Sequence, residues 1–215
     1  MVPEETKERP RYRQVLECKE KRVIMRRIER DNTGLMKPGQ DLVMAGYAGW
    51  AGTLRIADLK GAQLEQWFRP SYIENMLQTK WESPENTQSF WRSVGAAEWE
   101  EAGEGGVFAA LWRLSGAYMT GVEFWLRDIP LRQETVELCE RYELNPYRLL
   151  SEGAFVLAGD NGLDLVRNLR EKNIPAAVIG KVTTGIGRVI RSQDGTGYLE
   201  RPGRDEIEKI LHTVT

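Results

Sequence analysis

The fold can be inferred largely from the stretch between Gly105 and Gly159, which reads GGVFAALWRLSGAYMTGVEFWLRDIPLRQETVELCERYELNPYRLLSEGAFVLAG. After Gly106, apolar residues recur at helical spacing, which predicts a helix that starts at this glycine. Residues 122–126 alternate between apolar and polar, as a half-buried strand does. A further helix is predicted over 135–142 and a further strand over 155–157. The order of elements is therefore helix, strand, helix, strand.

The pattern continues on both sides of this stretch. Further helices are predicted over 163–172, over 205–211 and on either side of Pro70 within 59–77, and a short one is predicted to begin at Pro146. Strands are predicted over 42–45 and 176–182, and a hairpin around Asp194-Gly195. The segment 46–53, GYAGWAGT, favours irregular backbone over a plain strand. Helices and strands alternate without a long repeat, so we expect an α/β (α+β) fold with a mixed β-sheet and packed helices.

Composition excludes several classes of protein. Of 215 residues, 41% are hydrophobic and 29% charged, which is typical of a folded domain. The net charge of −2 argues against a nucleic-acid partner. The start lacks a signal peptide's apolar core and no apolar run is long enough to span a membrane, so we expect a cytoplasmic protein without a membrane partner. Cys18 and Cys139 form no CxxC motif and His212 is the only histidine, so no metal site is expected.

Residues 1–40 differ from the rest of the chain. Ten basic and six acidic residues lie within positions 1–30, with apolar residues that fit helical spacing for part of the segment. We therefore expect a basic, partly helical arm over 1–40 and a folded domain over 41–215. The turns Asn32-Thr33-Gly34 and Lys37-Pro38-Gly39 mark the boundary.

Several ordered segments within 41–191 resemble a known family. The markers are Gly105-Gly106, Ile129-Pro130, Asn145-Pro146, Ser151-Glu152-Gly153 and Ile179-Gly180-Lys181-Val182. In this order they closely resemble the C-terminal domain of the aminoimidazole ribonucleotide (AIR) synthetase-like superfamily. That group also includes a hydrogenase maturation factor, thiamine-monophosphate kinase, selenophosphate synthetase and formylglycinamidine synthase. The likeness is strongest to bacterial AIR synthase-related proteins of the hydrogenase-maturation-factor type, and it implies the fold of that C-terminal domain.

The resemblance also implies what is missing. Family members use ATP and magnesium through an N-terminal domain, and the residues before position 41 are expected to be too few to build it. The family's Asp-x-Thr-x-Gly-Gly loop reads here with Glu101 in place of the aspartate and Gly103 in place of the threonine. The C-terminal cysteine of the hydrogenase maturation factor is absent from the ending HTVT. We therefore expect no catalytic residues, and no ATP or magnesium unless a partner chain completes the site.

The glycine turn is the candidate binding site. Glycines before a helix expose N–H groups at its positive end and favour an anion such as a phosphate. The candidate phosphate-binding residues are Gly103, Gly105, Gly106 and Val107, with Glu101, Glu104, Ser151 and Gly153 as possible additions. The alternative is that these glycines only permit a tight turn, and the acidic residues at 98–104 oppose an anion.

Seven tryptophans are many for this length, and Trp81, Trp91 and Trp99 stand in polar surroundings that favour a contact surface. Two classes of function follow. The first is a non-catalytic interaction or regulatory protein derived from an ATP-dependent enzyme, which pairs with a second copy or with a full-length AIR synthase-like relative. The second is a half-enzyme that binds a phosphorylated small molecule and completes an ATP-dependent site with a partner chain.

Overall fold

A computed structural model describes residues 36–79 and 84–211. One compact unit begins at Met36. The predicted arm over 1–40 falls almost entirely outside the described residues, as do Trp81 and His212. The prediction for the arm therefore stays a prediction.

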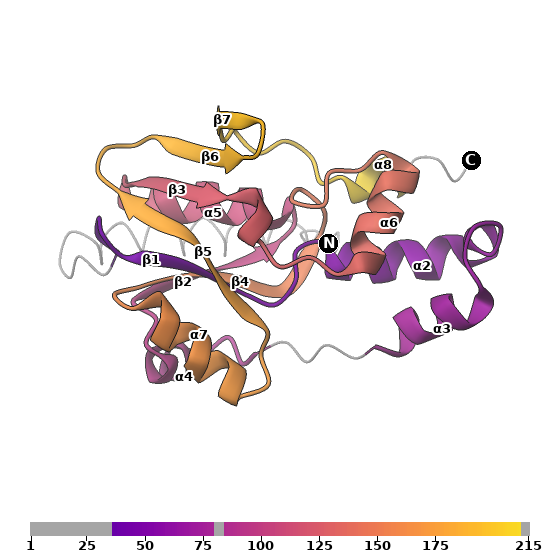
Figure 1. The fold of residues 1–215 in the computed structure, drawn as a ribbon, viewed down its shortest axis with the longest axis horizontal. Helices are drawn as coiled ribbons and strands as arrows, with labels where there is room; N and C mark the ends of the chain where they lie inside the picture. Colours follow the sequence, from indigo (N-terminus) through magenta and orange to yellow (C-terminus); the bar gives the residue numbers. More distant parts are fainter. Residues whose placement is uncertain (1–35, 80–83, 212–215) are drawn as a thin grey trace, which may run out of the picture. The chain divides into compact units, whose positions relative to one another are not determined.

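The described residues form a seven-stranded mixed sheet in the order β2-β4-β1-β5-β3-β6-β7 (Figure 1). Its strands are β1 (Asp41–Ala45), β2 (Glu98–Gly103), β3 (Gly121–Trp125), β4 (Ser151–Gly159), β5 (Ala176–Thr183), β6 (Arg188–Ser192) and β7 (Gly195–Tyr198). All pairings are antiparallel except that of β3 with β6. The predicted fold class, a mixed sheet with packed helices, is confirmed.

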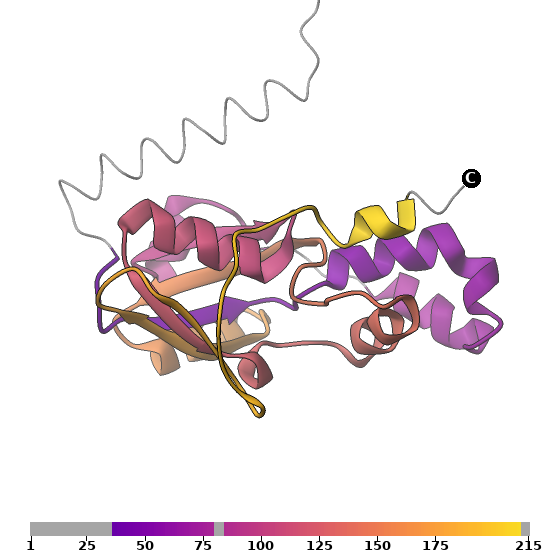
Figure 2. The same cartoon turned by 90° about the horizontal axis from the view of Figure 1, so that it is seen from above.

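Helices cover both faces of the sheet, α5 on one side and α7 on the other (Figure 2). α5 (Gly106–Tyr118) packs on β2, β3 and β4, and α7 (Gly162–Glu171) packs on β1, β4 and β5. α4 (Gln88–Val94) lies against α7. Successive strand side chains point to opposite faces, so Val43 and Leu157 join the core under α4 and α7 while Leu42 and Val156 are buried on the other face. Burial on both faces makes the central strands almost wholly apolar.

A second core lies beyond the end of the sheet, where four helices gather (Figure 1). These are α2 (Trp50–Leu64), α3 (Pro70–Gln78), α6 (Gln133–Tyr142) and α8 (Ile207–Leu211). Ile56, Ile73, Leu138 and Ile207 are buried together there. Cys139 is buried in the same core, and the desolvation raises the pKa of its thiol to about 12.

Several sequence expectations differ from the structure. The acidic segment before the glycine turn, residues 98–103, forms strand β2, which was not predicted as a strand. Helix α4 was not predicted either. In the segment 46–53, residues 46–49 form a turn, with Gly49 in the left-handed region at φ 69°, and residues 50–53 are the start of helix α2. The predicted short helix at Pro146 is wrong: the residues form a hydrogen-bonded turn, with Arg148 N–H donating to the Asn145 carbonyl at 3.0 Å. Trp91 is not a surface residue but a fully buried one, with its ring tilted against that of Phe155 at a centroid distance of 4.7 Å.

Candidate functional site

The glycine turn lies between edge strand β2 and helix α5. Gly103, Gly105 and Gly106 have φ values of 45°, 77° and 64°, in the left-handed region that glycine adopts without strain. A methyl group on Gly106 would lie 2.5 Å from the Tyr147 carbonyl oxygen and 2.8 Å from that of Leu149. Gly106 is therefore needed for close packing as well as for the turn.

The N–H group of Gly105 in this turn is already hydrogen-bonded to a side-chain carboxyl of the same chain. Gly105 N–H donates to Asp205 Oδ2 at 2.6 Å. The other oxygen of the same carboxylate accepts from Leu150 N–H at 3.1 Å and from Ile207 N–H at 2.9 Å. Asp205 is only 4% exposed. The Asp205 carboxyl, from the segment that leads into α8, therefore already occupies the position at the turn where an anion would bind.

Burial acts on the charge of Asp205. Desolvation raises the pKa of this carboxyl above its ordinary value, and the neighbouring charge of Glu104 raises it further. The N–H donors of Ile207, Gly105 and Leu150 act in the opposite direction and favour the ionised form. The net direction is upward, because burial is the largest of these effects.

The other N–H groups at the start of α5 face a covered environment. Phe108 N–H donates to the Tyr147 carbonyl at 3.1 Å. Within the described part of the chain, the N–H groups of Gly106 and Val107 have no hydrogen-bond partner, and both residues are buried. Backbone of the 147–149 segment lies directly against Gly106, on the side where a side chain would stand.

The acidic residues on and beside β2 differ in their contacts. Glu101 Oε1 accepts from Gly153 N–H at 3.3 Å, while Glu104 is exposed. Arg113 on α5 binds the Glu100 carboxylate at 3.0 Å and donates to the carbonyls of Glu101 and Ala102 at 2.8 and 3.2 Å. The carboxylates of Glu100 and Glu101 are therefore engaged in holding the strand to its neighbours.

Ser151 and Gly153 lie beside the turn, since Ser151 pairs with Gly103 across the β2–β4 ladder. The Ser151 hydroxyl is fully buried, accepts from Gly49 N–H at 2.8 Å and donates to the Leu149 carbonyl at 2.7 Å. This hydroxyl connects β4 to the turn that starts α2. The structure thus brings the predicted residues together, and their contacts are with the chain itself.

Sequence reasoning missed Asp205 and Tyr147, which the structure places at this turn. A local signal for Asp205 exists: an aspartate before a short apolar helix is a favoured N-cap, and Ile207 N–H is the donor such a cap takes. No local signal connects it to Gly105, because the two residues are 100 positions apart.

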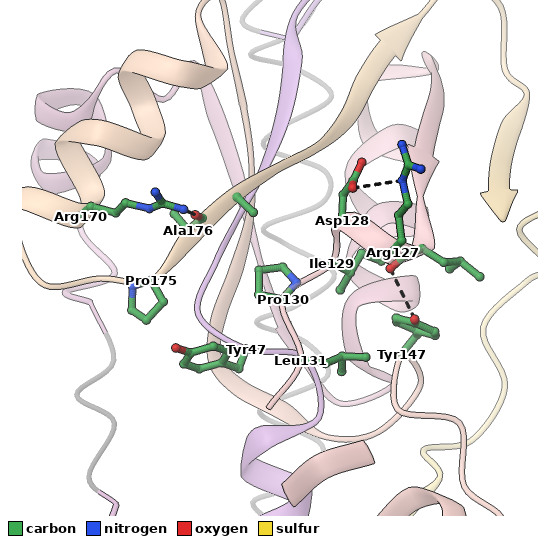
Figure 3. Close-up of a pocket in the computed structure, with 12 residues that line it drawn as sticks. Tyr47, Arg127, Asp128, Ile129, Pro130, Leu131, Tyr147, Arg170, Pro175 and Ala176 are labelled. Atoms are coloured by element: carbon green, nitrogen blue, oxygen red, sulfur yellow. Dashed lines mark hydrogen bonds and ion pairs between the residues drawn. The ribbon is translucent and has the colours of Figure 1, made fainter. Parts of the chain in front are cut away.

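A separate cavity of about 530 Å³ lies at the end of the sheet where β1 and β3 end and β5 begins. Figure 3 shows Arg170 and Pro175 on one side of it, Arg127 and Tyr147 on the other, and Pro130 between them. The remaining lining residues are Tyr47, Leu126, Asp128, Ile129, Leu131, Ala176 and Ala177. A smaller cavity of about 370 Å³ shares Leu126, Arg127 and Tyr147 with it.

Partly exposed aromatic side chains gather where α2, α3 and α6 meet. The rings of Trp67 and Tyr142 meet edge to face at 6.0 Å, and those of Phe68 and Tyr72 stack at 5.5 Å. Arg141 lies over the Trp67 ring at 4.9 Å. A hollow of about 450 Å³ opens beside them. We call these five residues the aromatic corner.

Two features are absent from the part of the chain that the structure describes. No group of three or more His, Cys, Asp or Glu side chains is placed to hold a metal ion. Over the same residues, no helix has the length and apolar character required to cross a bilayer.

The comparisons place the fold among solved structures. No family model and no curated protein matches the sequence. The structure of the hydrogenase maturation protein HypE from E. coli matches with a TM-score of 0.61 at 20% identity, covering 81% of this chain and 53% of that one. HypE in the HypE–HypF complex matches with a TM-score of 0.60 at 18% identity, covering 78% and 54%. Thiamine-monophosphate kinase from Stenotrophomonas maltophilia matches with a TM-score of 0.55 at 16% identity, covering 75% and 52%.

The chain therefore has the α/β fold that HypE and thiamine-monophosphate kinase share. The resemblance drawn from the sequence is confirmed for the fold. This chain spans about half the length of the solved structures it matches.

Proposed function

We propose that this chain is a non-catalytic interaction or regulatory protein with the fold of an ATP-using enzyme, and that it works by binding another protein chain. The partner is a second copy of itself or a full-length relative of the same fold. The observation that supports this most is the Asp205 carboxylate, which occupies the first donor of the glycine turn. A second anion there would have to displace this acceptor from the Gly105 N–H group.

Charge decides between this proposal and the phosphate-binding half-enzyme. The positive end of a helix is worth about 0.3–1 kcal/mol to a surface anion. One fixed carboxylate at the same end cancels that gain, and Asp205 is such a carboxylate at 2.6 Å from Gly105 N. We therefore expect phosphate affinity no better than millimolar at Gly103, Gly105, Gly106 and Val107.

The aromatic corner supports a protein partner. Trp67 is 37% exposed, and Leu59, Leu77 and Leu211 on the same group of helices are also exposed large apolar residues. Aromatic and arginine side chains are the residues that most often dominate binding energy in protein interfaces. Among the similar structures, HypE has been solved in complex with HypF, so a protein with this fold does bind another chain.

The proposal is tested by two measurements on the purified chain. Calorimetry with magnesium-ATP should give no dissociation constant tighter than about 10 µM, which corresponds to about 7 kcal/mol of binding. Sedimentation velocity should show a species heavier than the monomer. Tight nucleotide binding contradicts the proposal, and so does a monodisperse monomer that recovers no partner from its host.

A further inference from the structure

The cavity beside the sheet end has the size and position of a small-molecule site. Its volume of about 530 Å³ lies within the range of roughly 300–1,000 Å³ found for ligand pockets. β1 and β3 both pair with β5 in the antiparallel sense, so their carboxyl ends meet at the cavity.

Backbone hydrogen bonds hold the walls of this cavity in place. Gly46 N–H donates to the Pro175 carbonyl at 2.7 Å, which ties the end of β1 to the start of β5. Ala48 N–H donates to the Pro130 carbonyl at 2.9 Å. Pro130 and Pro175 have restricted backbones and no N–H of their own, so they give the cavity rigid apolar surfaces. A preformed site does not have to be ordered when the ligand binds.

Arg170 provides the charge of the site. One of its Nη atoms donates to the Ala176 carbonyl at 2.9 Å, which directs the guanidinium across the start of β5 (Figure 3). No carboxylate of the described residues lies within 4 Å of it. Arg167, on the same helix, is instead paired with Asp164 at 2.7 Å. The donors of Arg170 that remain match a carboxylate or phosphate.

The opposite wall adds aromatic surface and little net charge. Arg127 pairs with Asp128 at 3.5 Å, so these two side chains nearly cancel. Burial raises the pKa of Tyr147, which keeps its phenol neutral. Tyr47, Tyr147 and the two prolines line the cavity, and aromatic rings and prolines supply apolar surface that a planar ligand can contact.

We propose that this cavity binds a small planar organic anion, with its carboxylate or phosphate on Arg170 and its ring between Tyr47 and the prolines. The cavity shares Tyr147 with the surroundings of the glycine turn, but the charge on Arg170 belongs to the cavity alone, and the proposal does not depend on the proposed partner binding. It would let the concentration of a metabolite act on this protein.

The test uses two planar anions and their neutral counterparts: nicotinate against nicotinamide, and uridine monophosphate against uridine. Ligand-observed NMR on the full chain gives the affinities, and backbone shifts at Ala176 and Ala177 give the location. We expect at least one anion to bind, and its neutral counterpart to bind at least about tenfold more weakly. Binding by nicotinate alone identifies a carboxylate ligand, and binding by the nucleotide alone identifies a phosphate ligand.

Two matched variants locate the charge. Arg170→Met should weaken the anion at least about tenfold, to the level of the neutral compound. Arg167→Met, which removes an arginine already paired on the same helix, should leave the affinity unchanged. The inference is overturned if neither anion binds at millimolar concentration, if the neutral compounds bind equally well, or if both variants weaken binding alike. Thermal melting of each variant confirms that it is folded.

Discussion

The carboxylate of Asp205 accepts a hydrogen bond from Gly105 N–H at 2.6 Å, across 100 positions of sequence. The contact brings the start of the last helix to the start of α5, and Leu150 and Ile207 donate to the same side chain. One buried acid therefore fixes the position of three backbone segments. It also fills the place where an anion would otherwise meet the glycine turn.

Replacing Asp205 with alanine should destabilise the fold. Three N–H groups lose their acceptor, and a buried donor left without a partner costs about 1–3 kcal/mol. Part of that loss is offset because a buried charge is removed, so we expect about 2–4 kcal/mol from urea unfolding followed by tryptophan fluorescence. Asp164→Ala, which removes a half-exposed carboxylate that contacts Asn161 Nδ2 and Arg167, should cost about 1 kcal/mol or less. Equal losses for both variants would show that Asp205 has no special role.

The same side chain should make stability depend on pH. Burial raises the pKa of Asp205 in the folded protein above its unfolded value. The contribution of this group to stability is therefore complete below the unfolded pKa, and it is lost as the pH rises through the folded pKa. Relative to Asp205→Asn, the wild-type free energy of unfolding should fall as the pH rises above the unfolded pKa of an aspartate, about 3.9. Urea midpoints at several pH values measure this difference, and a rise over the same range would contradict the assignment.

Two glycines of the turn should respond differently to alanine. At Gly106 the added methyl group meets backbone oxygens at 2.5 and 2.8 Å, and its φ is 64°. We expect Gly106→Ala to lower the free energy of unfolding by about 2–5 kcal/mol. Gly103 has a φ of 45° but nothing within 4 Å, so Gly103→Ala should cost about 1–2 kcal/mol. Urea unfolding compares the two, and a larger loss at Gly103 would refute the close packing at Gly106.

The aromatic corner should control self-association. Trp67→Ala removes a partly exposed ring that Arg141 and Tyr142 hold in position. We expect it to weaken the dissociation constant of the oligomer by about 30-fold or more, as truncation of a dominant interface residue does. Tyr198→Ala is the control, because Tyr198 is a 73% exposed aromatic residue on edge strand β7. Sedimentation velocity over a concentration series decides, and equal behaviour of both variants would place the interface elsewhere.

Local sequence patterns predicted much of the fold. Helical spacing located α5, α6 and α7, and short apolar runs located β1, β4 and β5. Strand β2 was missed because it carries several acidic side chains, and those of Glu100 and Glu101 meet their partners, Arg113 and Gly153 N–H, only in the folded chain. Trp91 was misassigned for a related reason: its polar neighbours along the chain face away while the indole enters the core.

The candidate site was predictable only in part. The glycines that form the turn are visible in the sequence, and so is their place before a helix. What occupies the turn is decided by tertiary contacts with Asp205 and the 147–150 segment, which no local pattern encodes. The cavity at the sheet end was not predicted either, since Tyr47, Pro130 and Arg170 come together only through the sheet order.

A titration of the wild-type chain with ribose 5-phosphate tests directly whether Asp205 keeps a phosphate away from the glycine turn. The backbone amide signals of Gly105, Gly106 and Val107 report on binding there. Because Asp205 already accepts from Gly105, we expect no saturable shift of these signals and a dissociation constant weaker than about 1 mM. Saturable shifts of these three amides with a dissociation constant tighter than about 1 mM would contradict it and favour the phosphate-binding half-enzyme.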